Sequence, residues 1–152
     1  MTVKVLILED NPVARDFLSR VLRESFSDPI SITEAGDLET ARQQISLTGP
    51  QGLHGADPFK LMLVDLELPD GNGLELIRHV AAQGWPCETL VISVFGEDDK
   101  VFECVEAGAG GYLVKGQGDA YLSDHLHDLF AGGSPVSPRI AKRLLAAVRR
   151  GQ

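Results

Sequence analysis

The chain has 152 residues, of which 43% are hydrophobic, and a net charge of −8 at pH 7. That length suits one domain with a single hydrophobic core and excludes two large domains. No apolar run reaches the length of a bilayer span and the N-terminus lacks a signal-peptide pattern, so we expect a cytoplasmic protein without a membrane partner. Cys87 and Cys104 fit no metal-binding spacing and are expected to stay unpaired.

Charge is unevenly distributed along the chain. Residues 1–133 hold all 22 acidic residues and nine basic ones, whereas residues 134–152 hold five basic residues and no acidic one. A surface that binds nucleic acid needs clustered Lys and Arg to replace the phosphate counterions. The acidic body is therefore not expected to bind DNA by itself.

Apolar segments of strand length alternate with segments of helical periodicity. The predicted strands are residues 3–8, 30–34, 61–64, 89–93 and 111–114. The predicted helices begin at Pro12 and then cover residues 38–47, 74–82, 99–107 and 120–131. Strands that are apolar nearly throughout and joined by helices favour a five-stranded parallel sheet with helices on both faces, a doubly wound α/β fold.

Two segments depart from this alternation. Residues 48–60, rich in glycine and proline, are longer than the usual loop of such folds and are predicted to be a surface insertion. Residues 132–135 contain strong helix breakers, and after them Ile140, Leu144 and Val148 resume helical spacing. An extra C-terminal helix is therefore predicted over residues 138–150.

Polar side chains end four of the predicted strands. Glu9 and Asp10 end the first and Asp65 the third, so the fold brings three carboxylates to the edge where such sheets bind ligands. Like charges so close need a cation, and oxygen ligands favour a hard ion such as Mg²⁺. Ser93 and Lys115 end the fourth and fifth strands. A helix cap and a solvated lysine would explain these two singly, but the combination indicates a site.

These residues lie in stretches that together resemble the receiver domains of two-component response regulators. The stretches are residues 7–11 (ILEDN), 63–75 (LVDLELPDGNGLE), 91–93 (VIS) and 108–115 (GAGGYLVK). The resemblance spans roughly residues 3–131 and implies a flavodoxin-like sheet with strand order 2-1-3-4-5. It divides the chain into a receiver domain, residues 1–133, and a basic linker helix, residues 134–152.

The resemblance implies a metal site and an acceptor. Asp65 is similar to the aspartate that accepts the phosphoryl group, and it is also a metal ligand in the family. Asp10 resembles a direct ligand of Mg²⁺, for which Mn²⁺ can substitute, and Glu9 resembles a ligand that acts through a water molecule. Glu67 resembles the residue that offers its backbone carbonyl to the metal.

The resemblance also implies how a phosphoryl group is recognised. Ser93 and Lys115 match the two groups that contact the phosphoryl oxygens, and Tyr112 matches the aromatic residue that switches together with Ser93. Phosphoryl transfer spreads charge over three oxygens, so positioning and charge stabilisation supply most of the catalysis. The expected protein is a signalling switch rather than an enzyme, although it would catalyse its own phosphorylation and slow dephosphorylation.

Partners follow from the same resemblance. The phosphoryl donor would be a sensor histidine kinase or a phosphotransfer protein, and phosphorylation would favour a homodimer. The basic tail resembles the linker of NarL/LuxR-type transcriptional regulators, in which a helix-turn-helix domain follows. We therefore expect a protein cut in its linker rather than a stand-alone receiver, with DNA contacted only through the missing output domain.

Three other functions remain open. A flavodoxin-like cofactor binder would share the fold, but Glu9 and Asp10 would repel a bound phosphate. A phosphatase of the haloacid-dehalogenase type also uses an aspartyl phosphate, yet its nucleophile follows the first strand rather than the third. A pseudo-receiver, an interaction module that has lost phosphorylation, would not need the combination of Asp10, Asp65, Ser93 and Lys115.

Overall fold

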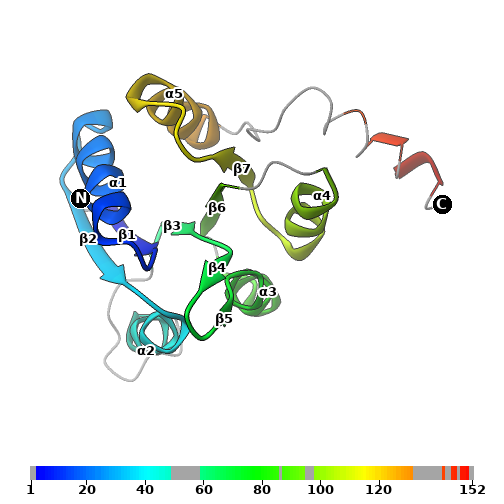
Figure 1. Ribbon diagram of the computed structural model, residues 1–152, viewed down its shortest axis with the longest axis horizontal. Coiled ribbons are helices and arrows are strands. Elements are labelled where there is room, and N and C mark those ends of the chain that lie inside the picture. The colour runs from blue at the N-terminus through cyan, green and yellow to red at the C-terminus, as the bar shows by residue number, and fades with distance from the viewer. Residues whose placement is uncertain are drawn as a thin grey trace.

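A parallel sheet forms the centre of the molecule. The computed structural model describes residues 3–48, 59–85, 87–94 and 98–131, together with residues 142, 145, 146 and 148–150. The five strands of the sheet lie in the order β2-β1-β3-β6-β7 (Figure 1). They are β1 (Val3–Leu8), β2 (Ile30–Ala35), β3 (Leu61–Val64), β6 (Glu88–Ser93) and β7 (Gly111–Val114). All neighbouring pairs are parallel, and the order is the predicted 2-1-3-4-5 once these five strands are numbered consecutively.

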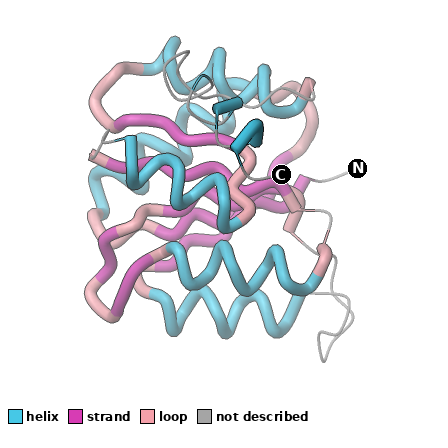
Figure 2. The backbone as a smooth tube through the Cα atoms, turned by 90° about the vertical axis from the view of Figure 1, so that its right-hand side faces the viewer, coloured by secondary structure: helices cyan, strands magenta, loops and turns pink. Residues whose placement is uncertain are grey.

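Helices cover both faces of the sheet. One face carries α1 (Pro12–Ser25) and α5 (Asp119–Phe130), and the other carries α2 (Leu38–Thr48), α3 (Leu74–Gln83) and α4 (Asp98–Ala107) (Figure 1). Figure 2 shows the strands as a central layer between the two helix layers. The doubly wound α/β fold predicted from the alternation of segments is therefore confirmed.

Side chains of each strand alternate between the two helix layers, as the pleat of a strand requires. Leu6 and Leu8 pack in the core beneath α2, α3 and α4, whereas Val5 and Ile7 pack in the core beneath α1 and α5. Burial of each such side chain stabilises the fold by roughly 1.5–3 kcal/mol. The two cores hold the strands rigidly, and with them the strand ends that carry the polar residues.

A short antiparallel hairpin follows β3 and was not predicted. It pairs β4 (Glu67–Leu68) with β5 (Gly71–Asn72). Asp70, in the turn between these two strands, accepts hydrogen bonds from the backbone amides of Leu38 at 2.8 Å and Glu39 at 3.0 Å. Leu38 and Glu39 are the first two residues of α2. The hairpin is thereby tied to the N-terminus of the neighbouring helix, where a carboxylate is favoured by the helix dipole.

This contact predicts a pH-dependent contribution to stability. The bonds from the Leu38 and Glu39 amides lower the pKa of Asp70 below its ordinary value. A lowered folded-state pKa contributes stability above the unfolded-state pKa, about 4, and that stability is lost as the pH falls through the folded-state pKa. Asp70→Asn should therefore melt at a slightly lower temperature than wild type at pH 7, and at the same temperature at strongly acidic pH.

The matched control is Asp28→Asn, which changes an exposed aspartate in the loop before β2. It should leave the melting temperature unchanged at both pH values. A difference between Asp70→Asn and wild type that persists undiminished at acidic pH would show that the Asp70 charge does not stabilise α2.

The ends of the strands and helices agree closely with the predicted ones. For the five strands of the sheet and for α2 to α5, the bounds differ from the predicted ones by at most one residue, and α1 begins at the predicted Pro12. Residues 49–58 of the predicted insertion lie outside the described residues, and so does most of the tail. Residues 142, 145, 146 and 148–150 are described, and each is helical, in accord with the predicted C-terminal helix. Among the described residues, no helix combines the length and apolarity that crossing a membrane requires.

Candidate functional site

Three carboxylates meet at the carboxyl edge of the sheet. Glu9, Asp10 and Asp65 each offer an oxygen, and these oxygens all lie within 4.8 Å of one another. The residues meet because β1 and β3 are neighbours, and the Asp65 amide donates to the Leu8 carbonyl at 2.9 Å. Glu9 and Asp65 are buried at 1% and 7% exposure, whereas Asp10 is exposed. The structure thus brings together the acidic residues that the sequence placed at separate strand ends.

Lys115 extends into this cluster from the residue after β7. Its Nζ contacts Oε1 of Glu9 and lies 3.0 Å from Oδ2 of Asp65. Burial by itself would lower the pKa of Lys115, but its hydrogen bonds to Glu9 and Asp65 raise that pKa above the ordinary value overall. The ammonium therefore stays charged and bridges two of the three carboxylates.

Backbone amides hold the second carboxylate oxygen of Glu9 and of Asp65. Oε2 of Glu9 accepts from the Asn11 amide at 3.1 Å, and Oδ1 of Asp65 accepts from the Glu67 amide at 3.4 Å. Burial raises the pKa of Glu9, although Lys115 and the Asn11 amide offset part of that rise. The Asn11 side chain caps α1 by accepting from the amides of Val13 and Ala14, which fixes the turn that carries Asp10.

The charge balance of the cluster fits a divalent cation. One ammonium faces three carboxylates, and Asp10, the exposed one, has an oxygen close to Asp65. Hard cations such as Mg²⁺ take carboxylate and carbonyl oxygens and retain several waters. Asp10 and Asp65 would hold such an ion directly, with Glu9 beside them and the carbonyl of Glu67, two residues beyond Asp65, as a further donor.

Ser93 and Tyr112 lie on the α2, α3 and α4 side of the sheet, below the same edge. Ser93 is fully buried, and its backbone carbonyl accepts from the Lys115 amide at 2.8 Å. Tyr112 is 5% exposed and packs in one core with Val101 and Cys104 of α4. The pleat places both side chains on this side of the sheet, because Val91, two before Ser93, belongs to the same core.

Gly73 and Arg15 also lie near the site, although neither was predicted to belong to it. A Cβ on Gly73 would lie 2.1 Å from the carbonyl oxygen of Asp65, so only glycine fits there. Its position in the Asp-Gly-Asn-Gly run was a signal for a tight turn. Arg15 reaches back from α1 to donate to the Glu9 carbonyl at 2.9 Å. Periodicity gave no signal for the direction of that side chain.

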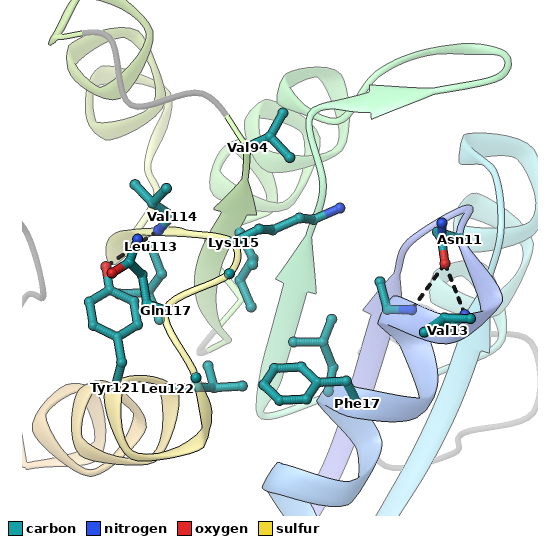
Figure 3. Close-up of a pocket in the computed structure, with 15 residues that line it drawn as sticks. Asn11, Val13, Phe17, Val94, Leu113, Val114, Lys115, Gln117, Tyr121 and Leu122 are labelled. Carbon is teal, nitrogen blue, oxygen red and sulfur yellow. Dashed lines mark hydrogen bonds between the residues drawn. The ribbon is translucent and has the colours of Figure 1, made fainter.

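A largely apolar hollow of about 660 Å³ opens beside Lys115 between the N-terminal parts of α1 and α5. Figure 3 shows Phe17 of α1 and Leu122 of α5 facing each other across it, with Lys115 extending from the end of β7. Two exposed valines, Val13 and Val94, also line this hollow. The polar site and an apolar surface thus adjoin each other at the carboxyl edge.

Comparison with known proteins places these features in a family. Residues 5–127 match the model of the response regulator receiver domain. The DNA-binding transcriptional activator DevR/DosR of Mycobacterium tuberculosis is 30% identical over 149 residues, which cover 97% of this chain and 63% of that protein. The nitrate/nitrite response regulator protein NarL of Escherichia coli K12 is 28% identical over 145 residues, which cover 95% of this chain and 62% of that protein.

A solved structure agrees in fold. The crystal structure of a two-component response regulator of the LuxR family from Aurantimonas sp. SI85-9A1 has a TM-score of 0.76 and 24% identity, with 100% of both chains covered. The chain spans somewhat less than two thirds of the length of the curated relatives named above. The family model matches most of the chain, the fold agrees with that of a solved response regulator, and Glu9, Asp10 and Asp65 cluster at one edge of the sheet. This chain therefore belongs to the response regulator receiver domain family.

Proposed function

We propose that this receiver takes a phosphoryl group onto Asp65 in a reaction that depends on Mg²⁺. The observation that carries the proposal is the position of Lys115, whose ammonium contacts both Glu9 and Asp65 while Asp10 remains exposed beside them. An anion that arrives at this edge would meet one fixed cation and a carboxylate nucleophile within reach of each other.

The proposed transfer uses the chain's own groups in defined roles. An Asp65 oxygen forms the new bond to phosphorus, and the bond between phosphorus and the donor atom breaks, with its electron pair going to the donor. The donor is a phosphohistidine of a kinase or phosphotransfer protein, or a small acyl phosphate. A carboxylate needs no base to activate it. When bound, Mg²⁺ would neutralise charge on the phosphoryl oxygens, and Lys115 would contact a further oxygen.

The proposed switch begins at Ser93. Its hydroxyl can bond a phosphoryl oxygen only when that group is present on Asp65. We propose that the Ser93 side chain then moves toward the phosphoryl group. This movement would change the space available to Tyr112, which lies on the same side of the sheet. Because Tyr112 packs against α4, the change would reach the surface formed by α4, β7 and α5. A modification that favours one arrangement shifts the population toward it.

The proposed output is control of transcription. It is supported by the relatives, one of which is named a DNA-binding transcriptional activator. In the tail, Leu145 and Val148 are exposed at 56% and 64%, and Lys142, Arg149 and Arg150 are exposed basic residues. We propose that residues 134–152 link the receiver, residues 1–133, to a DNA-binding domain, and that their apolar side chains pack in a dimer favoured by phosphorylation.

The experiment that tests phosphorylation is intact-mass measurement after incubation with acetyl phosphate, with Mg²⁺ or with a chelator. We expect the mass of one phosphoryl group to appear only with Mg²⁺. A pseudo-receiver or a cofactor-binding protein would gain no mass in either sample, and that result would refute the proposal.

Dimerisation gives a separate prediction. Sedimentation velocity with beryllofluoride, a mimic of the phosphoryl group, should show a dimer where the untreated protein is a monomer. Asp65→Ala, which removes the acceptor, should stay monomeric in both conditions. A wild-type protein that remains monomeric with beryllofluoride would contradict the proposed link between phosphorylation and dimerisation.

A further inference from the structure

Arg15 reaches from the first turns of α1 back to the end of β1. Its Nη1 donates to the backbone carbonyl of Glu9 at 2.9 Å, and its Nε lies 3.9 Å from Oε1 of Glu34 on β2. A Cβ on Gly36 would lie 3.0 Å from the same Nη1. The side chain is 24% exposed. The guanidinium therefore lies between the end of β1, the end of β2 and Gly36.

The carbonyl that Arg15 holds belongs to the peptide that joins Glu9 to Asp10. The sheet ends just before this peptide: the Leu8 carbonyl accepts from Asp65, and the Glu9 amide donates to the Ala35 carbonyl. Beyond this point the Glu9 carbonyl accepts from Arg15 rather than from a strand. Because a peptide unit is planar, holding the Glu9 carbonyl also orients the bond from which Asp10 projects.

We infer that Arg15 is a positioning residue, which sets the direction of the Asp10 carboxylate through the Glu9–Asp10 peptide. The inference rests on the proposed function, because Asp10 is the proposed direct ligand of Mg²⁺. Arg15 touches neither the three carboxylates of the cluster nor the Lys115 ammonium in the contacts above, so its effect passes through the backbone. Groups that orient metal ligands in this way are commonly worth about 10–100-fold in metal affinity.

An electrostatic role and a positioning role for Arg15 predict opposite changes in Mg²⁺ affinity when the side chain is removed. A guanidinium near three carboxylates repels a divalent cation, so its removal would tighten Mg²⁺ binding if charge were its main effect. If Arg15 instead orients Asp10, its removal weakens Mg²⁺ binding even though the site becomes more negative. The sign of the change in affinity therefore separates the two explanations.

The test is calorimetric titration of the protein with Mg²⁺. We expect Arg15→Ala to bind Mg²⁺ about tenfold more weakly than wild type. Arg15→Lys, which keeps the charge and a long N–H donor for the Glu9 carbonyl, should bind more tightly than Arg15→Ala, whereas a pure charge effect predicts weaker binding. Glu34→Gln leaves the bond to Glu9 in place and should bind Mg²⁺ as wild type does.

A second readout distinguishes positioning from a general loss of structure. Phosphorylation by acetyl phosphate should need a higher Mg²⁺ concentration in Arg15→Ala, yet reach a rate within about twofold of wild type at saturating Mg²⁺. Mg²⁺ binding by Arg15→Ala that equals or exceeds wild type would overturn the inference, and so would Arg15→Lys binding as weakly as alanine. Should Arg15→Ala fail to fold, Arg15→Gln, whose shorter side chain does not reach the Glu9 carbonyl, takes its place, and Mg²⁺ binding at or above the wild-type level would then overturn the inference.

Mg²⁺ binding by the wild-type protein and its variants distinguishes failure of the proposed metal site from failure of the positioning role of Arg15. The proposed metal site would be refuted if the wild-type protein bound no Mg²⁺. It would also be refuted if the Asp10→Asn variant bound Mg²⁺ with the same affinity as the wild-type protein. Wild-type protein whose Mg²⁺ binding depends on Asp10 but not on Arg15 would refute only the positioning role.

Discussion

Gly73→Ala should destabilise the protein by about 3 kcal/mol, because the added methyl overpacks a filled space. The new Cβ would lie 2.1 Å from the Asp65 carbonyl oxygen and 2.7 Å from Cγ1 of Val64, so the backbone has to move. Gly73 has φ −58° and ψ −18°, which alanine adopts freely, and the cost is therefore purely steric. Since the displaced residue is Asp65 itself, phosphorylation should slow as well. Urea unfolding and the intact-mass assay measure the two effects.

Gly84→Ala is the matched control for this substitution. Gly84 ends α3 with φ +68°, and a Cβ there would meet no atom of a non-neighbouring residue within 4 Å, so alanine meets strain but no clash. Left-handed backbone costs a residue other than glycine about 1 kcal/mol. We expect Gly84→Ala to lose about that much and to be phosphorylated normally. Equal destabilisation by the two substitutions would contradict the argument from close approach.

Lys115→Ala should slow phosphorylation by about 100-fold, the typical effect of removing one preorganised group that stabilises developing charge. It should nevertheless retain Mg²⁺ binding. The Lys115 ammonium contacts Glu9 and Asp65, carboxylates that the metal site would also use, so the ammonium competes with the metal and is not needed to bind it. In the absence of metal, the Lys115→Ala variant should be less stable than the wild-type protein, because the Glu9 carboxylate is only 1% exposed and loses the Lys115 ammonium that pairs with it. Rates from intact mass, calorimetry with Mg²⁺ and thermal unfolding report these three effects.

Lys60→Ala removes an exposed lysine just before β3 and serves as the control for loss of charge. It should change neither the phosphorylation rate nor Mg²⁺ binding. Wild-type phosphorylation rates in Lys115→Ala would remove Lys115 from the proposed chemistry. Complete loss of Mg²⁺ binding in that variant would instead make the lysine part of the metal site.

Much of the fold could be predicted because apolar runs and helical periodicity report burial directly. Strands β1, β3 and β7 have the predicted bounds, and α1 begins at the predicted Pro12. The bounds of β2, β6, α2, α3, α4 and α5 differ from the predicted ones by at most one residue. The hairpin of β4 and β5 was not predicted, since its two-residue strands, Glu67–Leu68 and Gly71–Asn72, carry no periodic pattern. It depends on the turn at Asp70 and on contacts with α2, which are far away in the sequence.

The sequence predicted which strand ends carry the residues of the candidate site, but not the contacts between their side chains. The topology of a doubly wound sheet brings Asp10, Asp65 and Lys115 to one edge without any knowledge of side-chain directions. Which groups touch is a different matter, because long side chains choose among rotamers according to neighbours from other elements. The bridge from Lys115 to Glu9 and the return of Arg15 to the Glu9 carbonyl therefore emerged only from the structure.

Asp65 is the proposed phosphoryl acceptor, and locating the phosphoryl group in the sequence distinguishes it from every other residue. Borohydride reduces an acyl phosphate to an alcohol, so treatment of the phosphorylated protein followed by peptide mass spectrometry marks the residue that carried it. We predict the mark at Asp65 alone, and no phosphoryl gain in Asp65→Asn, which keeps the size of the side chain. A mark at any other residue, or an Asp65→Asn protein phosphorylated at the wild-type rate, would show that Asp65 is not the acceptor.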